Sequence, residues 1–148
     1  MKVSKDIKQL RVFEESILLN YKAFLSSLVT IIKSARSNEA KKPLSDVAIM
    51  CATDLLVSVP HFNFRSELLK IVVARVSRQT VDDAFIKCRT ALETLFREDE
   101  EGRAGLEAVS MISKMLKTRH YQVHPSVYLP SDIDLINSLS RVCYIYGC

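Results

Sequence analysis

Residues that could act as nucleophiles, acid–base groups or metal ligands are few in this sequence and widely scattered. The four cysteines, at positions 51, 88, 143 and 148, form no Cys-x-x-Cys pair, and the three histidines lie at positions 61, 120 and 124. Structural zinc sites draw their ligands from closely spaced pairs, so this pattern gives zinc little support. Cys51 and Cys88 fall on apolar helical stripes, where a thiol usually packs as a small hydrophobic group. We therefore expect buried thiols and a reducing intracellular compartment.

Serine, histidine and carboxylate chemistry also lack the sequence context that they need. Ser66, Ser110 and Ser113 lie in no Gly-x-Ser-x-Gly turn of the kind that exposes a nucleophile. His61 has no partner in the sequence that would orient it as a base. The acidic run at residues 98–101 lacks the pattern of a calcium loop, and the three glycines form no nucleotide-binding motif. We expect no enzyme activity, no cofactor, no metal and no small-molecule substrate.

Basic side chains are the chemistry that the chain does offer. Its 21 lysines and arginines exceed its 17 acidic residues, and the net charge of +4 permits contact with nucleic acid without requiring it. One basic group recurs every three residues at the start of the chain: Lys2, Lys5, Lys8 and Arg11.

A second basic group consists of Lys114, Lys117 and Arg119 and is followed by His120 and Tyr121. Cations beside an aromatic ring suit contacts to phosphates and bases. Each basic group also has a plainer interpretation. The first can be a solvated helix face, and the second can cap the last carbonyls of a helix. Contact with RNA or an acidic partner is the alternative for both.

Composition and periodicity indicate one all-α domain. A chain of 148 residues can bury a substantial core, and three glycines and four prolines suit helices better than a turn-rich β fold. No run of about 18 uncharged apolar residues is present, so no membrane span is expected. After a capping Ser4, apolar residues recur at steps of three and four as far as Ala35, which predicts a helix of about 45 Å.

Four further helices follow from apolar periodicity. We predict them at about residues 45–59, 64–77, 80–98 and 103–119, after a polar linker at residues 37–43. Ser45 offers a cap for the first of them, and Thr80 with Asp83 resembles a capping box for the third.

A short turn organises these helices. Pro60 lacks the N–H that a helix needs, so the helix before it ends near Val59. Asn63 can cap the next helix, and so short a connection folds the two into an antiparallel hairpin. Phe62 and Phe64 are expected to plug the turn.

Two sets of apolar residues are separated by a constant 37 residues: Val47, Cys51, Leu55 and Val59, then Ala84, Cys88, Leu92 and Phe96. Each set begins a helix-turn-helix unit, and the period is close to that of HEAT and armadillo repeats. A coincidence of helical spacing is the alternative. We predict antiparallel hairpins at residues 45–77 and 80–119, stacked as a short HEAT/armadillo-like α-solenoid and braced by the long first helix.

Two segments resemble a known family. Pro60, His61, Phe62, Asn63 and Phe64, preceded by Asp-Leu-Leu-Val at residues 54–57, resemble the signature segment of the nucleolar complex-associated protein 3 family. Residues 3–11, followed by Phe-Glu-Glu at 13–15 and Tyr-Lys at 21–22, resemble the helix that begins its amino-terminal conserved domain. The resemblance runs from about Lys2 to Val127, and neither motif is catalytic.

The resemblance implies a nuclear, nucleolar scaffold that assembles and transports precursors of the large (60S) ribosomal subunit. Its implied partners are a homologue of nucleolar complex protein 2 and pre-60S particles. A chromatin-binding role in the initiation of DNA replication, with replication-origin proteins, is one alternative, and a module that binds ribosomal RNA directly is another. Residues 1–127 would form the family's N-terminal helical domain. Residues 128–148 diverge from the family, either as a short helix starting at Ser131 or as a gene-model artefact.

Overall fold

The computed structural model describes residues 4–127, which form five α-helices and two short 3-10 turns and contain no strand. The elements are α1 (Lys5–Ser34), η1 (Glu39–Lys41), α2 (Lys42–Ser58), α3 (Arg65–Val76), α4 (Asp83–Glu98), α5 (Arg103–Thr118) and η2 (Pro125–Val127). The all-α prediction is confirmed for these residues. The α-solenoid stays a prediction, and the expected tail at 128–148 lies outside the described residues.

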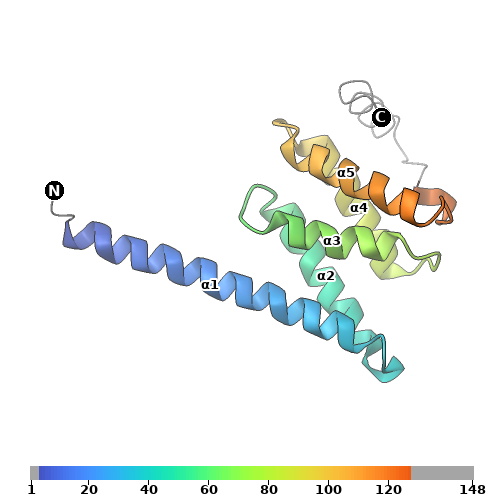
Figure 1. Ribbon diagram of the computed structural model, residues 1–148, viewed down its shortest axis with the longest axis horizontal. Helices are drawn as coiled ribbons and strands as arrows, with labels where there is room; N and C mark the ends of the chain where they lie inside the picture. Colours follow the sequence, from blue (N-terminus) through green and yellow to red (C-terminus); the bar gives the residue numbers. More distant parts are fainter. Residues whose placement is uncertain (1–3, 128–148) are drawn as a thin grey trace.

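The core forms where two consecutive helix pairs meet (Figure 1). α2 packs on α4, and α3 packs on both α4 and α5, so the pair at residues 45–77 contacts the pair at 80–119 as predicted. The largest fully buried side chains come from three of these helices: Thr53 and Leu56, Leu68, Leu69 and Val72, and Phe85 and Cys88.

α1 joins this core along only part of its length. Ser4 caps the helix as predicted, since its hydroxyl accepts a hydrogen bond from the N–H of Asp6 at 3.4 Å. Further along, Leu25 and Leu28 are buried and Tyr21 packs against the core. α1 contacts mainly α2, with a smaller contact to α3, and its first half projects away from the other helices (Figure 1). α1 was predicted to brace both hairpins, but only its second half contacts the other helices.

By length and mean hydropathy alone, α1 is also the one described helix that could cross a membrane, although no membrane span was expected from the sequence. Several polar residues interrupt its surface. Lys22 is exposed, and the exposed hydroxyls of Ser26, Ser27 and Thr30 donate to carbonyls one turn earlier. In this second half of α1, a buried apolar face with Leu25 and Leu28 is opposed by a polar face, which is typical of a helix that packs on protein.

Two predicted helix N-caps, Ser45 and Thr80, are not the N-caps in the structure, because a nearby proline or aspartate starts the helix instead. α2 begins at Lys42 with Pro43 in its first turn, where the missing N–H costs nothing, and Ser45 is buried within the helix. α4 is capped by Asp82, whose carboxylate accepts the N–H of Phe85 at 2.9 Å. The predicted caps at Ser45 and Thr80 were therefore wrong.

The turn before α3 differs from the prediction in its cap and in its packing. Phe64, with φ of 65°, occupies the N-cap position without a side-chain bond, so Asn63 does not cap α3. The Tyr21 ring of α1 lies edge-on to Phe62, with centroids 5.0 Å apart, and 6.2 Å from Phe64. Phe64 is half-buried and Phe62 is exposed, as are His61 and Asn63. Phe62 therefore does not plug the turn, and Phe64 fills it only in part.

The buried face of α2 is one residue out of register with the set of residues that defined the predicted 37-residue repeat. Val47 and Cys51 are exposed, and the residues that follow them are buried instead: Ala48, Ala52 and Leu56. α2 lies between α1 and α4, and small side chains at 48 and 52 let both helices approach closely. The buried thiol is thus wrong for Cys51 and confirmed for Cys88. The buried sets of α2 and α4 are 36 residues apart instead of 37.

Candidate nucleic-acid interface

The structure separates the two predicted basic groups. Lys5, Lys8 and Arg11 are exposed on the projecting half of α1, and steps of three residues turn successive side chains by about 60°. Lys2 lies outside the described residues. The second group lies near the end of α5, on the far side of the helical core from the start of α1 (Figure 1).

Two members of the second group line a groove between α3 and α5. The groove has a volume of about 370 Å³, and its walls include Lys114 and Arg119 of the α5 end together with Lys70 of α3. Its apolar walls include Met111 and Met115. Lys117 is exposed but does not line this groove. The structure therefore brings together part of the predicted group and adds a lysine from another helix.

A second groove lies on the other side of α3. It has a volume of about 270 Å³, and Lys33 and Arg36 at the end of α1 line it opposite Lys70 and Arg78. Lys70 borders both grooves, so they adjoin each other across α3. We call this surface the basic groove. It contains six exposed cationic residues: Lys33, Arg36, Lys70, Arg78, Lys114 and Arg119.

Most of these cations are not neutralised within residues 4–127. Among the six, only Lys70 has an ion pair in that range, with its Nζ 2.7 Å from Oε1 of Glu67. Lysines and arginines spaced along a groove suit a sugar–phosphate backbone, because each can neutralise a phosphate and donate hydrogen bonds to its oxygens. Tyr121, two residues after Arg119 in the sequence, is exposed just beyond the end of α5.

Sequence reasoning missed Lys33, Arg36, Lys70 and Arg78. These residues come from the end of α1 and from α3, and no sequence spacing relates them to the α5 group. Lys33, Arg36 and Arg78 lie at or near the end of a predicted helix, which equally indicates compensation of the helix dipole. Lys70 lies in the middle of α3, and no signal in the sequence marked it.

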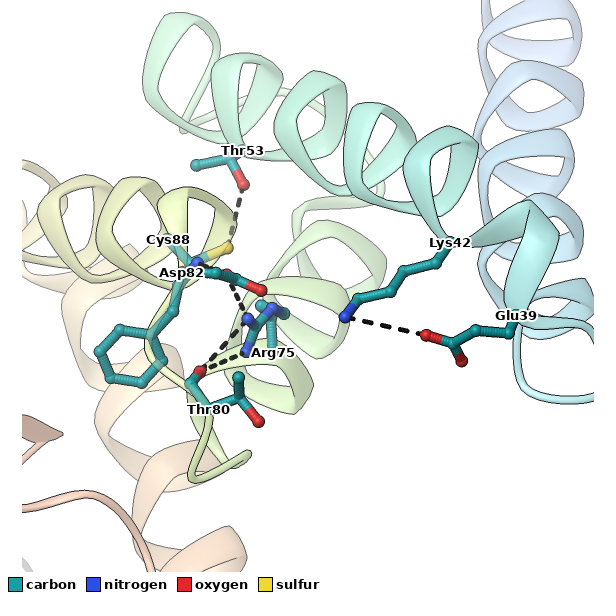
Figure 2. A network of polar contacts seen from close by, with 8 residues as sticks. Glu39, Lys42, Thr53, Arg75, Thr80, Asp82 and Cys88 are labelled. Atoms are coloured by element: carbon teal, nitrogen blue, oxygen red, sulfur yellow. Dashed lines mark hydrogen bonds and ion pairs between the residues drawn. The ribbon is translucent and has the colours of Figure 1, made fainter.

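A buried arginine fixes the turn beside this groove (Figure 2). Arg75 is only 3% exposed; its guanidinium donates to the carbonyl of Thr80 at 3.3 Å and pairs with the carboxylate of Asp82. Its Cζ also lies 5.9 Å from the centroid of the Phe85 ring. Burial by itself raises the pKa of Asp82, but the Phe85 N–H and Arg75 outweigh it and hold that pKa below its ordinary value. The α3–α4 turn, which contains Arg78, is thereby held in one conformation.

A second polar contact holds the walls of the groove together. Glu107 of α5 accepts a hydrogen bond from Nε of Arg65 at 2.9 Å and another from the hydroxyl of Ser66. Arg65 also donates to the carbonyl of Pro60 at 3.1 Å. Partial burial tends to raise the pKa of Glu107, but the Ser66 and Arg65 bonds outweigh it, so the net shift is downward. These bonds fix the start of α3 against α5.

The described residues contain no group of three or more His, Cys, Asp or Glu side chains that could hold a metal ion. The buried thiol Cys88 lies 3.4 Å from the hydroxyl of Thr53 (Figure 2). Burial raises the pKa of Cys88, which favours the unreactive thiol over the thiolate. Its role is core packing.

No protein-family model matches the chain. It is 34% identical over 141 residues to nucleolar complex-associated protein 3 of Schizosaccharomyces pombe, which covers 93% of the chain and 19% of that protein. It is 35% identical over 136 residues to nucleolar complex protein 3 homolog of Xenopus laevis (85% and 17%). It is 32% identical over 129 residues to nucleolar complex-associated protein 3 of Arabidopsis thaliana (85% and 14%). The chain thus spans about a fifth or less of the length of these curated relatives.

Proposed function

Since the chain belongs, over the segment that it shares, to the nucleolar complex-associated protein 3 family, we propose that it is a non-catalytic helical scaffold in ribosome biogenesis. The nucleolar names of relatives from yeasts, vertebrates and a plant support a location in the nucleus and nucleolus. In this proposal, residues 1–127 form a helical domain that helps to assemble and transport large-subunit precursors. Its partners are a homologue of nucleolar complex protein 2 and pre-60S particles.

The observation that carries this proposal beyond the family is the basic groove. Five of its six cations have no ion pair within the described residues, and they come from both sides of α3. We propose that this surface contacts the phosphate backbone of ribosomal RNA. The Arg75 and Glu107 contacts support the proposal because they hold the surrounding helices in place before RNA binds.

Salt dependence tests this contact directly. Binding of the 148-residue chain to a single-stranded segment of large-subunit ribosomal RNA should weaken with salt, with a slope of about 0.7 per phosphate contact. Reversing Lys114 and Arg119 to glutamate should remove about two contacts and lower the slope by about 1.4. Reversing Lys41 and Lys42, which lie outside the groove, is the matched control and should change the slope less.

Two results would contradict the assignment. An unchanged slope in the Lys114→Glu/Arg119→Glu variant would remove the basic groove from RNA binding. A flatter slope in Lys5→Glu/Lys8→Glu alone would move the contact to the first basic group on α1, whose role stays a prediction.

Purification from cells tests the wider role in ribosome biogenesis. Recovery of large-subunit precursors is expected, whereas recovery of origin-bound helicase loaders in their place would overturn it.

A further inference from the structure

The projecting half of α1 carries an apolar face on which no described residue packs. We call it the exposed α1 face and define it by four residues: Ile7, Leu10, Phe13 and Ile17. Leu10 is 56% exposed and Phe13 is 63% exposed, although they lie within a continuous helix. Spacings of three and four residues place all four side chains on one side of α1. Contiguous exposed apolar residues of this kind mark interaction sites.

The exposed α1 face continues an interface that the protein already uses. Ile7 precedes Leu25, and Leu10 precedes Leu28, by 18 residues, which is five full turns of an α-helix. Leu25 and Leu28 are buried where α1 packs on α2. Ile7 and Leu10 therefore point in the same direction as the side chains that α2 covers. The projecting half of α1 thus carries an apolar face in line with the face that packs on α2, but no described helix covers it.

Two carboxylates give this face its charge. Glu14 lies one turn after Leu10 and just under one turn before Ile17, and Asp6 lies one turn before Leu10, so both border the apolar side chains. Neither has an ion pair within residues 4–127. Lys8 is two residues from Leu10, about 200° around the helix, and so lies on the opposite side. Arg11 follows Ile7 by four residues and flanks the face on one side, so the apolar face carries two carboxylates and a single cation at its edge.

We infer that the exposed α1 face binds an amphipathic helix of another protein, one whose apolar stripe is bordered by lysine or arginine. The cations would pair with Glu14 and Asp6 while the stripe packs on Leu10, Phe13 and Ile17. The inference rests on the proposed function, because a scaffold of a multiprotein complex needs such a surface. A second copy of this chain fits poorly, because two such faces would bring four carboxylates into the seam with only two arginines, Arg11 of each copy, to meet them. An anionic membrane would repel the same two carboxylates.

The test places a photo-cross-linking amino acid at single positions of α1 in the full family protein in cells. Leu10 and Ile17 are the test positions. Val12 and Leu19 are the matched controls, because they are also highly exposed but lie two residues away, on the opposite side of the helix. Mass spectrometry then identifies each cross-linked peptide. We expect Leu10 and Ile17 to cross-link to one segment of another protein that has apolar residues at steps of three and four and flanking cations. The controls should not reach it.

A synthetic peptide of the cross-linked segment completes the test. It should bind the 148-residue chain, and Glu14→Lys should weaken binding about tenfold, with recovery when the facing cation of the peptide is changed to glutamate. Three outcomes would each overturn the inference. They are cross-linking to a second copy, equal cross-linking on both sides of the helix, and binding of α1 only to phosphatidylcholine–phosphatidylserine vesicles. The salt slope for RNA should stay unchanged in Glu14→Lys, so failure here and failure of the proposed RNA contact are distinguishable.

Discussion

The buried pair of Arg75 and Asp82 allows the charge and the cap at the start of α4 to be measured separately. Asp82 does two things at once: it caps the helix through the N–H of Phe85, and it neutralises a buried guanidinium. Asparagine caps a helix about as well as aspartate, so Asp82→Asn removes the charge and keeps the cap. Asp82→Ala removes both. The difference between the two variants therefore gives the free energy of the cap.

The structure sets the expected magnitudes. Breaking a fully buried ion pair costs about 3–5 kcal/mol. Asp82 is a third exposed at its side chain, and Arg75 keeps its bonds to the carbonyl of Thr80. A hydrogen bond to a charged group, at about 1.5–3 kcal/mol, is thus the better guide for Asp82→Asn. The lost cap should cost Asp82→Ala about 1 kcal/mol more.

Urea unfolding of the two variants beside the wild type measures both terms. The pKa of Asp82 is lowered in the folded protein, so its stabilisation is present above the unfolded pKa of about 3.9 and is lost as pH falls through the lower folded value. The gap between wild type and Asp82→Asn should be constant from about pH 5 to 8 and close below about pH 4. A stability of Asp82→Asn equal to that of the wild type at pH 7 would refute the reasoning on charge.

Three further predictions concern other described contacts. Glu107→Gln should lower the free energy of unfolding by about 1.5–3 kcal/mol at pH 7, because Arg65 loses its charged partner. The pKa of Glu107 is lowered in the folded protein, so the difference from the wild type should fade as pH falls below about 4.3, through the folded pKa. Urea unfolding at several pH values measures this difference. Phe64→Gly should be more stable than Phe64→Ala by about 1 kcal/mol, because Phe64 has a positive φ, and the reverse order in unfolding experiments would contradict this. Iodoacetamide should label Cys51 in the folded protein and Cys88 only after unfolding, as peptide mapping can show; equal rates would mean that Cys88 is accessible.

Apolar periodicity predicted the helices well because most of them have one apolar and one polar face. α4 and α5 are strongly amphipathic, and the predicted apolar residues Cys88 and Leu92 of α4 are buried. α2 was harder to predict. Its segment is apolar nearly all round, since α1 covers one side and α4 another. No polar face defines its register, so the apolar pattern included the exposed Cys51 as well as the buried Ala52.

Caps and the candidate site depended on contacts that local sequence does not contain. Thr80 and Asp82 are both good N-caps by type, and the contact with Arg75 on the preceding helix accompanies the choice of Asp82. The basic groove depends on how α1, α3 and α5 meet. Spacing alone could identify Lys114 and Arg119 as a cationic pair, but only the packed helices bring Lys70 beside them.

The division of α1 at Tyr21 also determines how the amides of this helix exchange with solvent deuterium. From Tyr21 onwards, the backbone hydrogen bonds can open only if packing on α2 is disturbed, so their exchange should report unfolding of the core. Before Tyr21 the helix has no tertiary support, but the anchored half acts as its nucleus, and each further turn needs only propagation. Protection should therefore decline gradually from Tyr21 towards Lys5. One continuous helix would then contain amides that exchange through local fraying near Lys5 and amides that exchange only when the core unfolds.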